Sequence, residues 1–124
     1  MITIASLEQN GYRYFDNTFK RSSNLSADQD PYKGLYQKCI QDTQGKKYFI
    51  NFHCWDFSNS FAGHQNVDRE MGFEGEIQIN IPNGDSVNIA YLSAGKRNLN
   101  EIEAWFEKVW SSLGAQYYEK NEAA

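Results

Sequence analysis

Residues 73–81 have the sequence FEGEIQINI, in which apolar and polar positions alternate without a break. Successive side chains of a β-strand point to opposite faces, so this pattern predicts a strand with one buried face and one face in water. The turn-forming sequence PNGD follows at residues 82–85. The return strand continues the alternation with Val87, Ile89 and Tyr91. This stretch predicts an antiparallel hairpin whose water-facing side carries Glu74 and Glu76.

A second hairpin is predicted upstream, where residues 35–41 and 47–57 flank the turn sequence DTQG at 42–45. A turn centred near residue 44 sets Cys39 opposite Phe49 or Ile50. It also sets Cys54 opposite Gly34 or Leu35. The two thiols are then roughly 17 Å apart along the ladder, at about 3.3 Å per residue. That separation is too large for a disulfide, and we expect both cysteines to be free.

The clearest helix signal lies near the C-terminus. Its apolar residues recur at helical spacing: Leu99, Ile102, Trp105, Phe106, Val109, Trp110 and Leu113. Asn98 and Glu101 have the spacing of a capping box at its start, and Gly114 is a stop signal at its end. The face opposite the apolar stripe carries Glu103, Glu107, Lys108 and Ser111. We expect this helix to lie on the predicted sheet.

The N-terminal segment predicts a short helical turn over residues 6–11 and a strand over residues 12–19. Together the elements predict an α+β fold: an antiparallel sheet of about four or five strands with a C-terminal amphipathic helix packed on one face. A chain of 124 residues has the length of one domain, so we expect residues 1–124 to form a single domain.

The charge of the chain is mildly acidic and unevenly distributed. The formal net charge is −4, from 12 basic and 16 acidic residues. Residues 1–47 carry seven basic and five acidic residues, whereas residues 48–124 carry five and eleven. An acidic chain is a poor general binder of nucleic acid, because phosphates are negative. No apolar run approaches the ~20 residues that span a bilayer. No secretory signal is visible, and we expect a cytoplasmic protein without a membrane segment.

No motif for catalysis, for a cofactor or for nucleotide binding is present, and we expect neither an enzyme nor a cofactor. In the strand predicted over residues 47–57, His53 and Cys54 point to opposite faces and cannot form a dyad with each other. A catalytic dyad of Cys54 with His64 is still geometrically possible. A buried cysteine with a purely structural role is the commoner case. A metal site would need the scattered set His53, His64, Asp68 and Glu70. An ordinary histidine in a polar loop is commoner than a metal-ligating one, and we expect no metal.

Binding of single-stranded nucleic acid is an alternative. Basic and aromatic residues are interleaved at residues 12–15 with 19–21, and again at residues 46–49. A sheet that presents stacking rings is a common way to bind unpaired bases. The sequence pI of about 5.1 opposes this alternative, and we expect no direct nucleic-acid binding.

Three segments of the chain resemble a class of small accessory proteins encoded by bacteriophages and related mobile elements. The segments are LYQK at residues 35–38, GKKYFIN at residues 45–51, and EIEAWFE at residues 101–107 continuing through Tyr117-Tyr118-Glu119. The resemblance spans about residues 35–119 and includes no catalytic motif. It implies a protein that binds host macromolecules, including restriction and CRISPR components.

The leading hypothesis is a non-catalytic protein-binding accessory factor, in the form of a phage-encoded inhibitor that occupies a basic or nucleic-acid-binding surface of a host protein. Aromatic residues and complementary charge are effective at interfaces. The candidate contact residues are Glu74, Glu76, Glu103 and Glu107 for charge, with Trp55 and Phe57 as aromatic anchors. The alternatives are a single-stranded nucleic-acid-binding module, a small Cys/His enzyme, or a virion or assembly component. Whether the chain forms a homodimer is also left open by the sequence.

Overall fold

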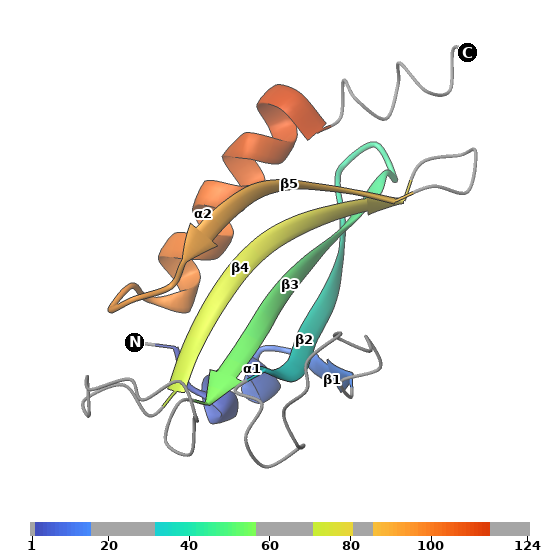
Figure 1. Ribbon diagram of the computed structural model, residues 1–124. Helices are drawn as coiled ribbons and strands as arrows, with labels where there is room; N and C mark the ends of the chain where they lie inside the picture. Colours follow the sequence, from blue (N-terminus) through green and yellow to red (C-terminus); the bar gives the residue numbers. More distant parts are fainter. Residues whose placement is uncertain (1, 16–31, 57–70, 81–85, 115–124) are drawn as a thin grey trace.

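The computed structural model describes residues 2–15, 32–56, 71–80 and 86–114 (Figure 1). The fold is α+β, as predicted. A five-stranded antiparallel sheet has the strand order β1-β2-β3-β4-β5. Helix α2 crosses behind the sheet in Figure 1. The elements are α1 (Ile4–Gln9), β1 (Arg13–Phe15), β2 (Tyr32–Gln41), β3 (Lys47–Asp56), β4 (Met71–Asn80), β5 (Ser86–Ser93), α2 (Leu99–Val109) and the π-helical turn η1 (Trp110–Gly114).

The hairpin β2–β3 forms where the sequence predicts it. The Asp42 carboxylate closes its turn by accepting hydrogen bonds from the backbone N–H groups of Gln44 and Lys46. Gly45 has a φ of +82°, a conformation that glycine adopts without strain. Cys39 lies opposite Phe49 and Cys54 lies opposite Gly34, which confirms the predicted register. Both cysteines are free, Cys39 exposed and Cys54 buried.

One face of the sheet and the two helices form a single apolar core. Four β3 side chains that share the helix-facing side of the strand are all buried in it: Tyr48, Ile50, Phe52 and Cys54. Helix α2 contributes Leu99, Ile102 and Phe106, and η1 contributes Trp110. Gly75 allows the close approach of α2, because a Cβ atom there would lie 3.0 Å from the Phe52 ring and 3.1 Å from the Phe106 ring. The N-terminal segment adds Ile2, Leu7 and Tyr12 to the same core.

Two predictions for the C-terminal helix are wrong. Asn98 is the N-cap residue, but its side chain makes no capping hydrogen bond. Trp105 and Leu113 do not belong to the buried stripe, since they are 41% and 63% exposed. A helix that lies on a sheet buries the side chains that point toward the sheet, and Trp105 is turned about 100° from its buried neighbour Phe106.

The ladder between β4 and β5 contains a β-bulge that the sequence pattern did not predict. Gly75 pairs with Leu92 and Ile77 pairs with Ile89, so both Ala90 and Tyr91 lie opposite Glu76. Ala90 has a φ of 60°, a left-handed conformation that is uncommon for residues other than glycine. The extra residue moves Tyr91 off the apolar face that it was predicted to share with Val87 and Ile89.

Candidate functional site

The structure places the predicted contact residues on two opposite surfaces. Glu74, Glu76 and Trp55 lie on the face of the sheet that points away from α2. Glu103 and Glu107 lie on α2 itself, beside the β2–β3 hairpin. Phe57 lies outside the described residues. The six candidates therefore do not form one continuous contact surface.

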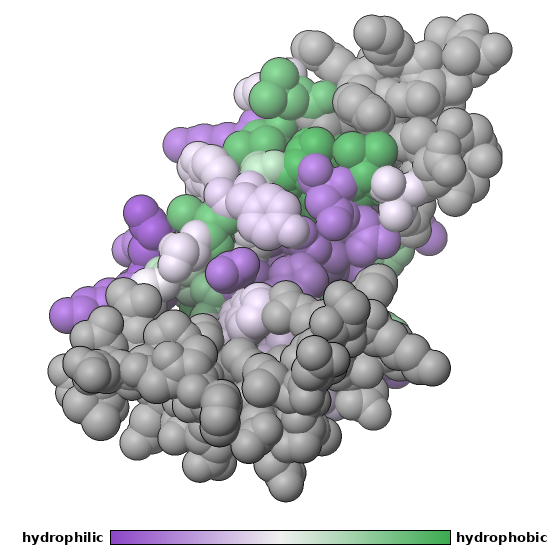
Figure 2. All heavy atoms as spheres, viewed as in Figure 1, coloured by the Kyte–Doolittle hydropathy of each residue, from purple (hydrophilic) through white to green (hydrophobic). Residues whose placement is uncertain are grey.

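On the face away from α2, polar side chains form a row across the central strands. Gln37 Nε2 donates to Asn51 Oδ1 at 2.9 Å. Asn51 Nδ2 donates to Gln78 Oε1 at 2.8 Å and to Glu76 Oε1 at 3.3 Å. His53 Nε2 lies 2.7 Å from Glu76 Oε1. Figure 2 shows hydrophilic residues across the middle of this face.

Glu76 is only 1% exposed, so the prediction of a water-facing acid at this position is wrong. The reason is its place in the sheet: long side chains from β3 and β5 surround the carboxylate. Glu74, two residues earlier on the same face, remains exposed. Only Glu74 of this pair can contribute charge to a surface contact.

His53 is held by hydrogen bonds at both ring nitrogens. Its Nδ1 lies 2.8 Å from the Tyr32 hydroxyl, and its Nε2 faces Glu76. In a neutral imidazole, Nε2–H donates to the carboxylate and Nδ1 accepts from the phenol. Both ring nitrogens of His53 therefore have hydrogen-bond partners within the polar row. Trp55, a predicted anchor, is half-buried and packs edge-on against Tyr32 at 5.0 Å between ring centroids.

Glu76 stays ionised although it is buried. Burial alone would raise its pKa, but the hydrogen bonds with His53 and Asn51 and the interaction with the Tyr91 hydroxyl outweigh burial and lower it. Its second oxygen, Oε2, meets no donor of good hydrogen-bond geometry among the described residues. The Tyr91 hydroxyl is the polar group that acts on the carboxylate from β5, and this interaction raises the pKa of Tyr91 to about 12. The bulge at Ala90 thus completes the row.

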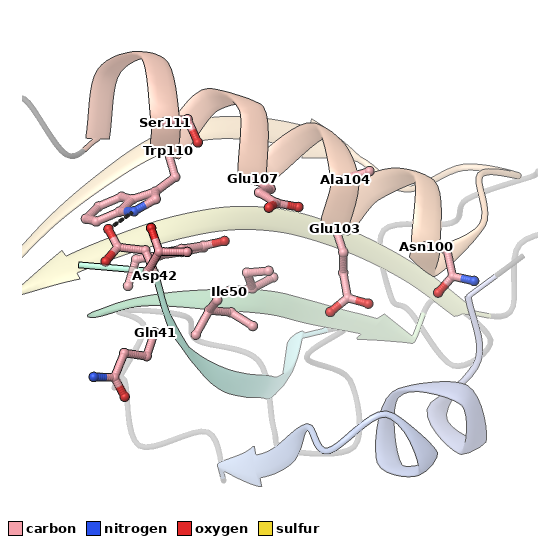
Figure 3. A pocket seen from close by; sticks show the side chains of 12 residues that line it. Gln41, Asp42, Ile50, Asn100, Glu103, Ala104, Glu107, Trp110 and Ser111 are labelled. Atoms are coloured by element: carbon pink, nitrogen blue, oxygen red, sulfur yellow. Dashed lines mark hydrogen bonds between the residues drawn. The ribbon is translucent and has the colours of Figure 1, made fainter. Parts of the chain in front are cut away.

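On the other side of the sheet, α2 and the β2–β3 hairpin enclose a groove of about 510 Å³ (Figure 3). Its apolar floor consists of Ile40, Tyr48 and Ile50. Carboxylates line it at three places: Asp42, Glu103 and Glu107. In Figure 3, Glu103 and Glu107 point from α2 toward the sheet. The lining residues include no lysine or arginine, so the groove is acidic.

Two of the three carboxylates are held in place by other side chains. Asp42 Oδ2 accepts a hydrogen bond from Trp110 Nε1 at 2.9 Å. Burial would raise the pKa of Asp42, but this bond and the turn N–H groups lower it. Glu103 Oε2 lies 3.0 Å from both Lys38 Nζ and the Tyr12 hydroxyl. Glu103 is therefore half-buried, and the prediction that it faces water opposite the apolar stripe is wrong.

Glu107 is the exposed carboxylate of the groove. It has no ion-pair partner within the part of the chain that the structure describes. Burial, together with the negative charges of Glu107, Glu103 and Asp42, raises the pKa of Tyr48 in the floor to about 12. The groove therefore combines one open carboxylate, two fixed carboxylates and a neutral aromatic floor.

The catalytic alternatives gain no support from the described residues. Burial raises the pKa of the Cys54 thiol to about 11, which disfavours the reactive thiolate at neutral pH. His53 lies on the opposite face of β3, as predicted, and His64 lies outside the described residues. Residues 2–15, 32–56, 71–80 and 86–114 contain no group of three or more side chains that could hold a metal ion. None of their helices is long and apolar enough to cross a membrane.

The interleaved aromatic residues are divided between core and surface. Tyr12 and Tyr48 are buried, so they cannot stack on bases. Tyr14 and Phe15 of β1 are 49% and 48% exposed. The Tyr14 ring packs against Tyr36 at 5.1 Å between centroids. Of the four rings Tyr12, Tyr14, Phe15 and Tyr48, the two of β1 are therefore the ones exposed to solvent.

Comparison of the chain with protein-family models, with curated proteins and with solved structures gives no match.

Sequence reasoning missed several residues of the two surfaces. Tyr32, Gln37 and Tyr91 belong to the polar row, and Asp42 and Trp110 form one wall of the groove. The predicted register already placed Gln37 near Asn51, so part of the row could have been found from the sequence. The bond between Asp42 and Trp110 joins residues 68 positions apart, and no local pattern reports it.

Proposed function

We propose that this chain is a non-catalytic protein-binding factor whose groove beside α2 holds a basic segment of its partner. The observation that carries the proposal is the composition of the groove: three carboxylates, an apolar floor and no basic residue in the lining. A groove of about 510 Å³ lies within the size range of protein sites for small ligands and side chains.

The groove suits the side chains of lysine and arginine. Their aliphatic stems pack on apolar surface while their charged ends remain with anions and water. In this groove the stem would lie on Ile40, Tyr48 and Ile50, and the charged end would meet Glu107. Asp42 in the wall adds to the attraction, whereas the charge of Glu103 is paired with Lys38.

The resemblance to bacteriophage accessory proteins gives the proposal a narrower form. In that form the protein acts in the cytoplasm of the host cell and inhibits a host defence or nucleic-acid-handling protein. Proteins that bind nucleic acid carry basic surfaces, and an acidic groove is complementary to such a surface. The chain would then compete with nucleic acid for its partner.

The experiment is a titration of the labelled protein with a short lysine- and arginine-rich peptide, followed by the indole N–H signals in NMR. The chain has three tryptophans, and Trp110 is the one whose indole lines the groove. Binding shifts the Trp110 signal, weakens as salt is raised, and is absent with a matched acidic peptide. Glu107→Lys weakens binding about five- to tenfold, because an attraction becomes a repulsion.

Glu74→Lys is the matched control, since it makes the same charge change on the opposite face of the sheet. It leaves the affinity within about twofold, the effect of one screened distant charge. The groove is the wrong site if Glu74→Lys weakens binding as much as Glu107→Lys does. Salt-sensitive binding of an oligonucleotide in place of the basic peptide would contradict the proposed partner class. Capture from a bacterial lysate with these two variants as baits would then separate specific partners from general ones.

A further inference from the structure

The flank of α2 opposite the groove forms a second, apolar surface. Glu103 points toward β2, where it pairs with Lys38, so the opposite flank of the helix points toward β5. That flank exposes Trp105 and Leu113, at 41% and 63% of their areas. Val109 lies between them along the helix and is partly buried against the core.

Strand β5 continues this apolar surface beyond the helix. It contributes Val87 and Ile89, which are partly exposed. We call Val87, Ile89, Trp105, Val109 and Leu113 together the α2–β5 surface. Figure 2 shows hydrophobic residues gathered over β5 and the C-terminal half of α2. Contiguous exposed apolar surface of this kind marks sites of association.

The charges beside the α2–β5 surface are arranged for pairing with a second copy. Glu101, Trp105 and Lys108 follow one another at spacings of four and three residues, so they share one line along α2. Two α2 helices that pack antiparallel, with a twofold axis between residues 104 and 105, bring Glu101 of each copy to Lys108 of the other. Trp105 then lies next to the axis.

Strand β5 fits the same arrangement. It is the last strand in the order of the described sheet, and none of its eight residues, Ser86–Ser93, is charged. A symmetric contact places a surface against its own copy, so like charges would repel there. A neutral strand beside a helix line that carries one acid, Glu101, and one base, Lys108, avoids that repulsion.

We infer that the α2–β5 surface binds a second copy of this chain, with the two α2 helices antiparallel across a twofold axis near Trp105. The inference does not depend on the proposed function, because the groove lies on the other flank of α2. A dimer of this form leaves both grooves open.

The test measures the oligomeric state by sedimentation across a range of protein concentrations. The wild-type chain forms a dimer. Trp105→Lys raises the dimer dissociation constant about 30-fold or more, because it removes a central aromatic residue and places two like charges at the axis. Glu101→Lys raises it about fivefold. The double variant Glu101→Lys/Lys108→Glu restores the wild-type value, because the exchanged charges pair again.

Glu107→Lys is the matched control, since it makes the same substitution on the groove flank and leaves the dimer intact. Far-ultraviolet circular dichroism verifies that every variant is folded. Three outcomes overturn the inference: a wild-type monomer at all concentrations, a Trp105→Lys variant that dimerises normally, or a double variant no better than Glu101→Lys. Glu101→Lys should leave the shift of the Trp110 signal on addition of the basic peptide unchanged. The dimer proposal and the groove proposal can therefore be refuted independently.

Discussion

The two faces of β3 become buried by different means. Phe52 on the helix side is 0% exposed, and Asn51 on the other side is 1% exposed. Phe52 lies among apolar side chains and makes an edge-on contact with Tyr12 at 5.4 Å between ring centroids. Asn51 is bonded to Gln37, Gln78 and Glu76. One face gains stability by removing apolar area from water, whereas the other must satisfy each polar group that it buries.

The difference shows why polarity along a strand does not report exposure. The alternation in residues 73–81 correctly separates the two faces of β4. It does not show that Glu76, at the centre of the polar face, is covered by its neighbours while Glu74 is not.

Phe52→Ala has the largest effect, because it empties the centre of the apolar face. We expect it to lower the free energy of unfolding by about 3–5 kcal/mol. Urea unfolding followed by circular dichroism measures the change. Phe49→Ala is the control from the other face of the same strand, where the ring is half-buried, and it should cost clearly less. Equal losses would mean that the two faces do not differ as described.

Glu76→Gln tests the polar face at its centre. The substitution keeps the shape but removes the charge that accepts from His53, and we expect a loss of about 1–3 kcal/mol. Glu74→Gln makes the same change two residues away in water and should cost less than about 0.5 kcal/mol. The same urea measurement applies to both variants. An unchanged free energy of unfolding in Glu76→Gln would show that the hydrogen-bond network adds no net stability.

The pH dependence of stability distinguishes the charge of Glu76 from its shape. Its pKa is lower in the folded chain than the ordinary value of 4.5, so the unfolded chain takes up the proton more readily as pH falls. The stabilisation is complete above the ordinary value and is lost as pH falls below it toward the folded pKa. Asp42 acts in the same direction. Between neutral pH and about pH 3, the free energy of unfolding should fall less for Glu76→Gln than for the wild type. The difference between the two pH profiles is the contribution of Glu76. Parallel curves would contradict an ionised Glu76.

The comparison of the two cysteines is the prediction with the smallest expected effect on stability. Cys39 is exposed on the open side of β2, whereas Cys54 is buried on the helix side with a pKa raised to about 11. At pH 8 we expect one thiol to react quickly with a disulfide reagent and the second only after unfolding. Modification of Cys39 should leave the unfolding midpoint nearly unchanged. Two thiols that react at one rate would exclude a protected Cys54.

Much of the fold could be predicted because its signals are local. Both hairpins, the Cys39 and Cys54 register, the start of α2 at Leu99 and the end of η1 at Gly114 follow from alternation, turn residues and helical spacing. The candidate site was predicted less well. Glu107 and Glu74 are exposed, as their positions suggested, but Glu76 is buried in a network and Glu103 is bonded to Lys38 and Tyr12. The helical pattern groups Trp105 with the core residues, because it cannot show how wide a strip of the helix the sheet covers; Trp105 is 41% exposed.

The sequence by itself determined which residues form strands and helices and which faces of them are apolar, because these properties depend on neighbours within a few positions. Only the tertiary structure decided that the acidic residues divide between two surfaces, that a bulge at Ala90 brings Tyr91 to Glu76, and that Asp42 meets Trp110. Each of these contacts joins segments far apart in the chain. Their geometry depends on cross-strand pairing and on the position of α2 on the sheet, so it cannot be predicted from a local sequence pattern.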